Sequence, residues 1–458
     1  MEFPRRLRLL HWEAYPSKSL SPTFHPEYPV ELNMRESQFE YLWQGTQPLK
    51  NLKKMDLQGS FNLKQLPDLS NATNLETLEL SKCINLQIIP DHMNLASLER
   101  MCMYGCWRLR NIPVMSTNIT ELYITETAVE DVPPSVRLCS RLTTLNLSRS
   151  GKLKGLTQLP KSVTYLDVRY SNIERIPDCI KDLHRLQFLF LSGCRKLTSL
   201  PELPGSLRFL MAEDCESLET VFCPLNTANA YLSFINCFNL DQQARRTIIQ
   251  HSCFLGETLL PGRQVPAEFD HRAKGNSLTI RYNGNNPPFA FSKFKVCVVI
   301  SPQQQVTEYG LLHQLLCRHT ARGDLYPVEY LISIFDLPKF KTEHLFIFII
   351  HSHLPFLDPS EVSREIVFEF SSNSHHFDII ECGVQNLTDE WSYESGFYQM
   401  FEEDMEFESS EASEDDTEYG DPTNGVICYS KEDENLECEN TQIVGVGSSS
   451  SASIYPIL

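Results

Sequence analysis

The sequence lacks any apolar run long enough to cross a lipid bilayer. Its longest such run, LFIFII at Leu345–Ile350, is far shorter than the roughly 20 apolar residues that a membrane-spanning helix needs. The beginning, MEFPRRLRLLHWEAYP, has a basic pair but no adequate apolar segment after it, so we expect no secretory signal. These features argue against a membrane-spanning or secreted protein.

The chain also lacks an excess of basic residues. Its 40 Lys and Arg residues are outnumbered by 59 Asp and Glu residues, for a formal net charge of −19. Most of that charge lies between Asp389 and Glu439, where nineteen acids accompany the single base Lys431. The other 40 acids and 39 bases nearly cancel. Because no basic stripe stands out, we expect no nucleic-acid partner, and the acidic segment is typical of a solvated tail.

Motifs that carry catalysis are missing as well. The sequence has no G-x-x-x-x-G-K-[ST] loop to cradle phosphates and no G-x-S-x-G nucleophile. His351 and His353, and the pair His375–His376, have no cysteine or carboxylate at a recognisable metal-ligand spacing. We therefore predict a protein that is not an enzyme, with no catalytic residues, no cofactor and no metal.

The sequence does contain a pattern of apolar residues that returns every 21 to 23 residues. The stretch NLETLELSKCINLQIIP, from Asn74 to Pro90, follows the template LxxLxLxx(C/S/T)xxLxx(L/I)P. Units that match it begin at Leu7, Pro29, Leu52, Leu75, Leu98, Ile119, Leu142, Val163, Leu186, Leu207 and Asn229. A fixed period in this range is the signature of leucine-rich repeats, in which each unit contributes one short strand to a curved parallel sheet.

Each unit has a small polar or thiol residue where the chain turns inward after the strand. This turn slot holds Ser37, Ser60, Cys83, Cys106, Thr127, Ser150, Ser171, Cys194, Cys215 and Cys237. We expect these side chains to hydrogen-bond buried backbone groups. Prolines at 67, 90, 113, 133, 177 and 201 are expected to stop any strand or helix from continuing. Five cysteines thus have a packing role, which favours free thiols in a reducing compartment over disulfides.

After residue 240 the repeat pattern stops. We predict a solenoid at 1–240, a helix or linker that closes its far end at 241–256, and an all-β sandwich at 257–392. Segments such as SLTIRY and FKVCVVIS are rich in β-branched and aromatic residues, which is typical of strands. The composition of 393–458, acidic and rich in serine, is typical of a disordered tail. The predicted fold is an α/β leucine-rich-repeat solenoid, a β-sandwich and a disordered acidic tail.

Several strings resemble a known family. RLRLLHWEAYPSKSL and PEYPVELNMRESQFEYLWQGTQPLKNLKKMDLQGS are similar to the repeat region of plant intracellular TIR–NB-ARC–LRR immune receptors. LLPGRQVPAEFDHRAKGNSLTI, FSKFKVCVVIS and FDIIECGV are similar to the domain after the repeats in those receptors, described as a C-terminal jelly-roll and immunoglobulin-like domain, or C-JID.

The resemblance covers about residues 3–385. It implies a cytosolic or nuclear plant protein whose repeats and post-repeat domain recognise pathogen effectors. We find no counterpart of the TIR and NB-ARC domains in this sequence, and the NAD-cleaving activity of the TIR domain is not carried over.

The strand side of the repeats carries outward side chains that form columns, because equivalent residues of adjacent strands lie about 4.8 Å apart. One column ends in Tyr165, Phe188, Phe209 and Tyr231, and the next contains Tyr123, Phe190 and Met211. Tyr104 and Tyr170 are expected on the same concave side. Earlier units carry charges there, at Glu31, Lys54, Asp56, Glu76, Glu79, Glu99 and Arg100. In the later domain, Arg263 and His271 are candidates for a binding edge.

The aromatic columns have two interpretations. They form a surface that contacts a partner, or the following domain folds back and covers them, and both can hold at different positions. For function, the first hypothesis is a recognition module of plant innate immunity that binds a pathogen effector protein. The alternative is a scaffold that pairs with or restrains a full-length TIR–NB-ARC–LRR receptor without touching effectors. A ubiquitin-ligase substrate receptor would need a helical adaptor-binding module, for which the sequence gives no signal.

Overall fold

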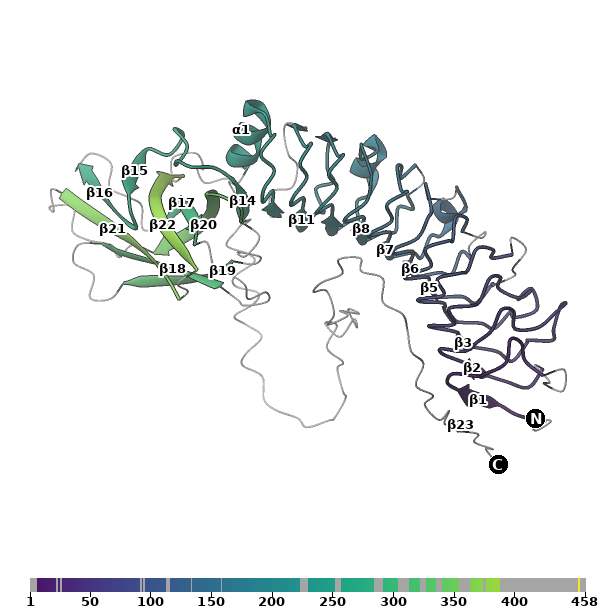
Figure 1. Ribbon diagram of the computed structural model, residues 1–458. Coiled ribbons are helices and arrows are strands. Elements are labelled where there is room, and N and C mark those ends of the chain that lie inside the picture. The colour runs from purple at the N-terminus through teal and green to yellow at the C-terminus, as the bar shows by residue number, and fades with distance from the viewer. Residues whose placement is uncertain are drawn as a thin grey trace, which may run out of the picture. The chain divides into compact units, whose positions relative to one another are not determined.

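The computed structural model describes residues 6–387 and the two residues 452–453, and Figure 1 labels its elements. Within 6–387 the description leaves out 22–23, 25–26, 91–92, 94, 113–115, 133, 158, 223–229, 252–256, 284–290, 304–312, 322–326, 335–339, 354–362 and 374–375. The described residues form a stack of repeats followed by an antiparallel β domain.

One short strand comes from each predicted repeat, and neighbouring strands pair in parallel at equivalent residues. The strands are β1 (Leu9–Trp12), β2 (Glu31–Asn33), β3 (Lys54–Asp56), β4 (Thr77–Glu79), β5 (Arg100–Cys102), β6 (Glu121–Tyr123), β7 (Thr144–Asn146), β8 (Tyr165–Asp167), β9 (Phe188–Phe190), β11 (Phe209–Met211) and β13 (Tyr231–Ser233). Figure 1 shows them along the inner side of the curve of the repeats, which we call the concave face. The predicted parallel sheet of a leucine-rich-repeat solenoid is confirmed.

Nine of the ten turn slots make the predicted hydrogen bonds to backbone carbonyls, and Ser171 contacts Cys194 Sγ instead. All ten slot side chains are buried. Cys83 Sγ donates to the carbonyl of Leu57 over 3.2 Å, and Ser150 Oγ donates to that of Ile124 over 3.0 Å. Each acceptor directly follows the strand of the preceding repeat, where the chain leaves the sheet and its carbonyl needs a new donor. Burial raises the pKa of Cys106 to about 12, so a thiol in this position stays protonated.

The residue before each slot adopts the left-handed backbone conformation. Glycine occupies this position in three repeats, at Gly59, Gly105 and Gly193, with φ between 71° and 74°. Other repeats place a non-glycine residue there, such as Lys82 with φ of 60°. The backbone N–H at this position donates to a carbonyl of the next repeat, for example from Gly59 to Ser81 over 2.8 Å. The inward turn is therefore the same in every repeat, although a side chain there costs roughly 1–2 kcal/mol.

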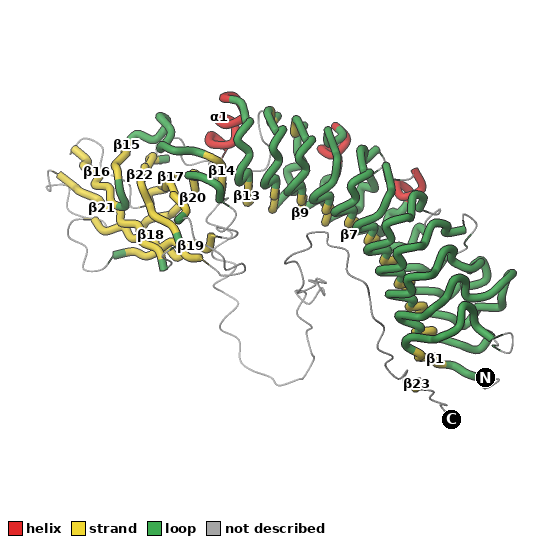
Figure 2. The backbone as a smooth tube through the Cα atoms, in the orientation of Figure 1, coloured by secondary structure: helices red, strands yellow, loops and turns green. Residues whose placement is uncertain are grey.

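The outer side of the repeats is built from irregular arms and a few short elements. These are the 3-10 helices η1 (Pro134–Leu138) and η2 (Asp178–Asp182) and the paired strands β10 (Ser199–Leu200) and β12 (Thr220–Val221). Figure 2 shows the helices in red on the side away from the strands. Pro177 also marks the start of an element, since it is the N-cap of η2, with φ of −69° in extended backbone.

The last repeat is closed by a strand as well as by a helix. Helix α1 (Gln242–His251) lies where the sequence predicts a closing helix. Beyond it, β14 (Thr258–Pro261) pairs in parallel with β13 and antiparallel with β20 (His344–His353). The repeat sheet thus continues directly into the following domain, as Figure 2 shows at β13 and β14. The prediction of a helical closure is therefore incomplete.

Polar contacts reinforce this junction between the repeats and the β domain. Lys295 is buried, and its ammonium group donates to the carbonyl of Ile249 in α1 while lying 6.0 Å from the ring centre of Phe269. On the other side, Lys341 Nζ lies 2.8 Å from Asp214 Oδ1 in the turn after β11. These contacts connect the two parts of the chain at several points.

The β domain consists of two antiparallel sheets around one apolar core. The first has the order β14–β20–β17–β22–β15 and the second the order β16–β21–β18–β19. The bounds of the remaining strands are β15 (His271–Lys274), β16 (Ser277–Asn283), β17 (Phe291–Pro302), β18 (His313–Ala321), β19 (Val328–Ile334), β21 (Ser363–Ser372) and β22 (Phe377–Asn386). Phe294 of the first sheet meets Phe368 of the second with ring centres 5.3 Å apart. The described part of 257–392 is thus built from strands, as predicted.

The predicted disordered tail, 393–458, lies outside the described residues except for one pair. Ala452–Ser453 form β23, which pairs antiparallel with β1 so that Ala452 lies opposite Trp12. At these two residues the expectation of disorder is not met.

Candidate functional site

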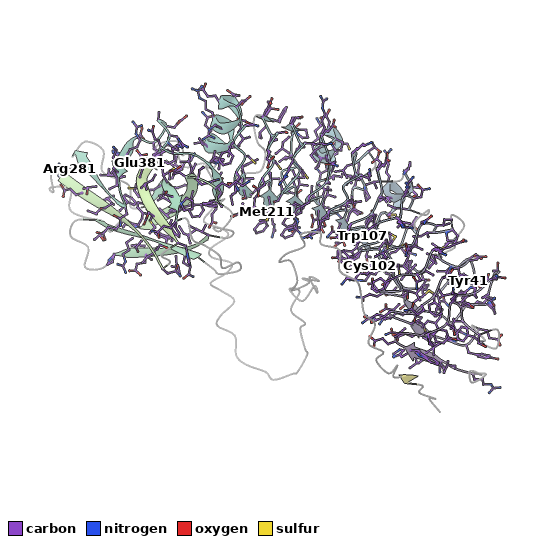
Figure 3. The ribbon with its side chains drawn as sticks, in the orientation of Figure 1. Tyr41, Cys102, Trp107, Met211, Arg281 and Glu381 are labelled. Atoms are coloured by element: carbon purple, nitrogen blue, oxygen red, sulfur yellow. The ribbon has the colours of Figure 1, made fainter. Side chains whose placement is uncertain are left out.

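Two columns of side chains cross the concave face in the arrangement that the repeat period predicts. In the first, Phe188 is paired with Tyr165 on one side and Phe209 on the other. Phe209 is in turn paired with Tyr231. We call these four residues, Tyr165, Phe188, Phe209 and Tyr231, the aromatic ladder. In the second column, Phe190 is paired with Met211, which Figure 3 marks on the strand side of the repeats.

The rings of the aromatic ladder touch one another in sequence. Phe188 and Phe209 are stacked, with ring centres 5.2 Å apart and planes inclined by only 7°. Tyr165 and Tyr231 extend the row at 6.2 Å and 6.0 Å with tilted rings. These separations lie in the favourable range for aromatic pairs. The stacking holds the ladder in one arrangement.

A partly buried ion pair supports the second column. Asp167 is buried, and Arg169 donates to both of its oxygens, from Nε over 3.0 Å and from Nη2 over 2.7 Å. Burial alone would lower the pKa of Arg169, but its hydrogen bonds to Asp167 outweigh that effect and the pKa is raised. The fixed guanidinium lies 5.3 Å from the ring centre of Phe190. This cation–π contact orients Phe190 beside Tyr165, 5.1 Å away.

Tyr123 lies apart from the ladder, in a more polar setting. Its hydroxyl donates to Glu121 Oε2 over 3.1 Å, and the guanidinium of Arg100 lies 4.9 Å from its ring centre. Arg100 also donates to Glu121. Burial, followed by the charge of Glu121, raises the pKa of Tyr123 to about 12. The tyrosine therefore stays neutral at physiological pH.

The first repeats carry charges in place of rings, as predicted. Many of these charges are already paired with one another. Lys54 lies 3.3 Å from Glu31, and Arg35 lies 2.8 Å from the buried Asp56. The more exposed pair, Lys54 with Glu31, contributes little to stability. The concave face changes from charged to aromatic along the chain.

Exposure differs between positions of the ladder. The side chain of Phe209 keeps 41% of its surface exposed, whereas Tyr231 is half-buried and packs against the core of the β domain. The following domain therefore contacts Tyr231, the last position of the ladder, as the second interpretation predicts. Phe209 remains exposed, and contact of the ladder with a partner stays a prediction.

The two remaining predicted tyrosines lie beside the strands. Tyr104 is half-buried, two residues beyond β5. Tyr170 is 53% exposed and adopts a left-handed φ of 55°. Its ring lies over Gly193, where an added Cβ would stand only 2.3 Å from Tyr170 Cδ1. The guanidinium of Arg149 lies 5.6 Å from the centre of the Tyr170 ring.

The contact between Gly193 and Tyr170 leads to a prediction with two matched controls. We expect Gly193→Ala to lower the free energy of unfolding by roughly 1–3 kcal/mol, because it combines a left-handed φ with a clash. Gly45→Ala keeps the left-handed φ without the clash, and Gly151→Ala has neither. Urea unfolding should rank the losses as Gly193→Ala, then Gly45→Ala, then Gly151→Ala. Equal losses of stability for all three variants would show that neither the left-handed φ nor the contact with Tyr170 determines the cost.

The two candidates in the β domain lie on different elements. Arg263 follows β14, is largely exposed, and has its Nε 3.5 Å from Glu343 Oε2. His271 begins β15, which pairs with β22 at the edge of the first sheet. The structure thus places His271 on a sheet edge, and Arg263 in an ion pair beside β20.

Sequence reasoning missed an exposed aromatic residue on the flank of the repeats. Trp107 is 62% exposed and donates from Nε1 to Glu126 over 3.4 Å. Figure 3 labels it away from Met211. Phe61 occupies the equivalent place two repeats earlier and is also exposed. Both directly follow a turn slot, where the repeat template leaves the residue open. The sequence signal that could have identified them is a large aromatic residue at a position where the repeat template requires no particular residue.

No group of three or more His, Cys, Asp or Glu side chains that could hold a metal occurs among the described residues. His351, His353 and His375 lie outside the side chains that the structure describes. Helices long and apolar enough to cross a membrane are likewise missing from the described part of the chain.

Comparison with known proteins matches both parts of the chain. The family model of the C-JID domain matches residues 260–407, and a leucine-rich repeat model matches residues 30–47. Disease resistance protein RML1B of Arabidopsis thaliana is 56% identical over 449 residues, covering 92% of this chain and 43% of that protein. Disease resistance protein RML1A of the same plant is 46% identical, covering 85% of this chain and 41% of its own length. The chain thus spans about two fifths of these relatives.

Solved structures show a weaker likeness. YopM from Yersinia enterocolitica WA-314 has a TM-score of 0.34 at 26% identity, over 45% of this chain and 42% of its own. The leucine-rich repeat domain of the type III effector XopL has a TM-score of 0.33 at 21% identity, over 46% of this chain and 70% of its own. Likenesses of this size have no bearing on function. From the family models and the curated relatives together, the chain carries leucine-rich repeats and a C-JID domain and is similar to that region of plant disease resistance proteins.

Proposed function

We propose that this chain is a non-catalytic recognition module of plant innate immunity that binds a pathogen effector protein. The binding surface is the concave face from Tyr165 to Met211, with Arg263 after β14 and His271 in β15 as two further, separate contacts on the C-JID domain. One observation carries the proposal, namely the stacked aromatic ladder that leaves Phe209 accessible. The similarity to Arabidopsis disease resistance proteins supports the plant-defence setting, and we place the protein in the cytosol or nucleus.

The ladder has the properties of an energetic centre of a protein interface. Aromatic residues are enriched at such centres, where truncation of one residue often costs 2 kcal/mol or more. The rings of Phe188 and Phe209 are stacked on each other, and Phe190 is held under the guanidinium of Arg169. Because the rings are already ordered, a partner loses little side-chain entropy when it binds them. The charged repeats before them supply polar contacts at the rim.

The proposal predicts that the double variant Phe188→Ser with Phe209→Ser loses effector binding. The full chain is expressed in plant cytosol together with candidate effector proteins, and the bound effector is identified after purification. We expect the double variant to bind that effector at least tenfold more weakly, since two interface aromatic residues are removed. Titration of purified components measures the change.

The matched control is Phe61→Ser, which removes an exposed aromatic residue that is not part of the ladder. It should bind the effector as the unmodified chain does. Limited proteolysis of all variants checks the junction between repeats and C-JID domain. If the double variant binds normally but its junction is cleaved faster, the ladder serves domain packing and the proposal is wrong.

A scaffold that pairs with a full-length TIR–NB-ARC–LRR receptor is the second candidate. The observation that favours it is the same exposed aromatic ladder, which suits contact with a receptor surface as well as with an effector. The same purification separates the two functions. Recovery of an effector without any full-length receptor supports direct recognition, and recovery of receptors alone supports the scaffold.

A further inference from the structure

The outer side of the repeats has a hollow where one repeat is shorter than its neighbours. From Thr144 of β7 to the paired Tyr165 of β8 the chain advances 21 residues, against 23 from β6 to β7 and 23 from β8 to β9. The two longer repeats carry η1 and η2, and the arm between them has no helix among its described residues. Figure 2 shows the two red helices with this arm between them. Where this repeat is two residues shorter than its neighbours, the arms surround an open hollow of about 780 Å³.

Three cationic side chains surround the hollow, one from each of three consecutive repeats. They are Arg137 in η1, Lys161 in the short repeat and Arg185 after η2, and all three are exposed. No ion pair joins any of the three to another described residue. Asp182 is the one carboxylate among the described residues that line the hollow. The local charge is therefore positive, although the chain as a whole has a formal net charge of −19.

We propose that this hollow binds a small organic molecule that carries two or more phosphate groups. Arg137 and Arg185 offer planar donors that match phosphate oxygens, and Lys161 adds a third positive charge between them. The buried Leu159 and Leu183 give the lining an apolar part that suits a carbon skeleton. The volume falls within the usual range for small-molecule sites. The site is separate from the aromatic ladder, because it lies on the outer arms rather than on the strands.

The shape of the hollow favours a small molecule over an extended acidic peptide. The hollow is one repeat wide, with η1 on one side and η2 on the other. An extended chain that ran along the repeats would meet these helices after a few residues, since a strand residue advances about 3.3 Å. A compact polyphosphate reaches all three cations without crossing either helix.

Cys179 lines the hollow and is exposed, whereas the other described cysteines are buried or half-buried. Its alkylation therefore reports occupancy in the full chain. We expect tripolyphosphate to slow the reaction of Cys179 with iodoacetamide at least threefold at low salt, as measured by mass spectrometry of the Cys179 peptide. The protection should saturate, and the apparent affinity should weaken about tenfold in 0.3 M salt, because the contacts are exposed charges. In a second experiment, vesicles that contain a bisphosphorylated phosphoinositide replace tripolyphosphate. Protection by the vesicles indicates a lipid headgroup as the ligand, and protection by tripolyphosphate alone indicates a free phosphate compound.

The test variant is Arg137→Gln with Arg185→Gln, which should lose the protection. Arg108→Gln with Arg110→Gln removes the same charge from exposed arginines that do not line the hollow, and it should keep the protection. Thermal melting confirms that both variants fold. Three results would overturn the proposal: no saturable protection by either phosphate probe, equal protection by citrate, or protection that persists in the test variant.

Discussion

Leu145→Asp is expected to unfold the middle of the repeat region. Leu145 is the central residue of β7, is fully buried, and is paired with Leu122 on one side and Leu166 on the other. The change removes a buried leucine, which contributes about 1.5–3 kcal/mol, and it introduces a carboxylate that has no partner in the apolar core. We expect a loss of more than about 4 kcal/mol. Because each repeat contacts only its neighbours, the damage should spread outward from β7.

Thr144→Asp is the matched control for this prediction. Thr144 precedes Leu145 in the same strand and is half-buried with its side chain on the concave face, so the same carboxylate can remain in water there. Hydrogen exchange read by mass spectrometry should show lost protection in the peptides of β6, β7 and β8 for Leu145→Asp alone. Comparable protection in the two variants would contradict the predicted side-chain alternation.

The second large effect is expected from acid at the junction between the repeats and the C-JID domain. His344 begins β20 and is fully buried, and its Nε2 accepts a hydrogen bond from the backbone N–H of Asn236 over 2.9 Å. Its Nδ1 lies 2.8 Å from the carbonyl of Thr342, to which it donates. The ring is therefore neutral, and protonation of Nε2 would remove the acceptor for Asn236.

Burial lowers the pKa of His344 to about 4, against an ordinary value of 6.5. The charged groups around it are Glu343, Arg245, Asp214 and Lys341, and burial outweighs the attraction of the acids. Because the folded pKa is the lower one, the unfolded chain binds the proton first as the pH falls. The contribution of His344 to stability is thus complete above about pH 6.5 and is lost toward pH 4. The loss amounts to roughly 2–3 kcal/mol.

This loss of stability has to be measured by comparing variants, because the acid Glu257 makes the folded chain more stable as the pH falls. Burial raises the pKa of Glu257 to about 7. That group adds stability as the pH falls from 7 toward its ordinary value of 4.5. His344→Gln keeps an acceptor for Asn236 but does not titrate. The difference in urea unfolding free energy between the unmodified chain and His344→Gln should shrink by roughly 2–3 kcal/mol from pH 7.5 to pH 4. A constant difference would show that His344 is not the titrating group.

The concave face was predictable in detail because a leucine-rich repeat sets its own register. Each strand must bury the leucine between two outward residues, so Leu189 inward puts Phe188 and Phe190 outward. A fixed period then places Phe209 next to Phe188 without knowledge of any distant contact. The ion pair of Asp167 with Arg169 was not predicted. The repeat template shows which side chains point outward, but it does not show which of these are covered by their neighbours.

The junction and the outer hollow could not be predicted in the same way. Strand β14 pairs with β20, more than 80 residues further along the chain, so Thr258 lies opposite Ile347. No local pattern around Thr258 encodes that partner. The hollow depends on one repeat being two residues shorter, and its charges come from Arg137, Lys161 and Arg185 in separate arms. Their meeting depends on how neighbouring arms stack.

By itself, the sequence determined the solenoid, the contents of its turn slots and the order of side chains on the concave face. These features repeat locally, and each repeat imposes its register on the next. Only the tertiary structure decided how the repeat sheet continues through β14 into the C-JID domain, which positions of the ladder stay exposed and where the outer cations gather. Those features arise from contacts between residues far apart in the chain, and local periodicity does not encode such contacts.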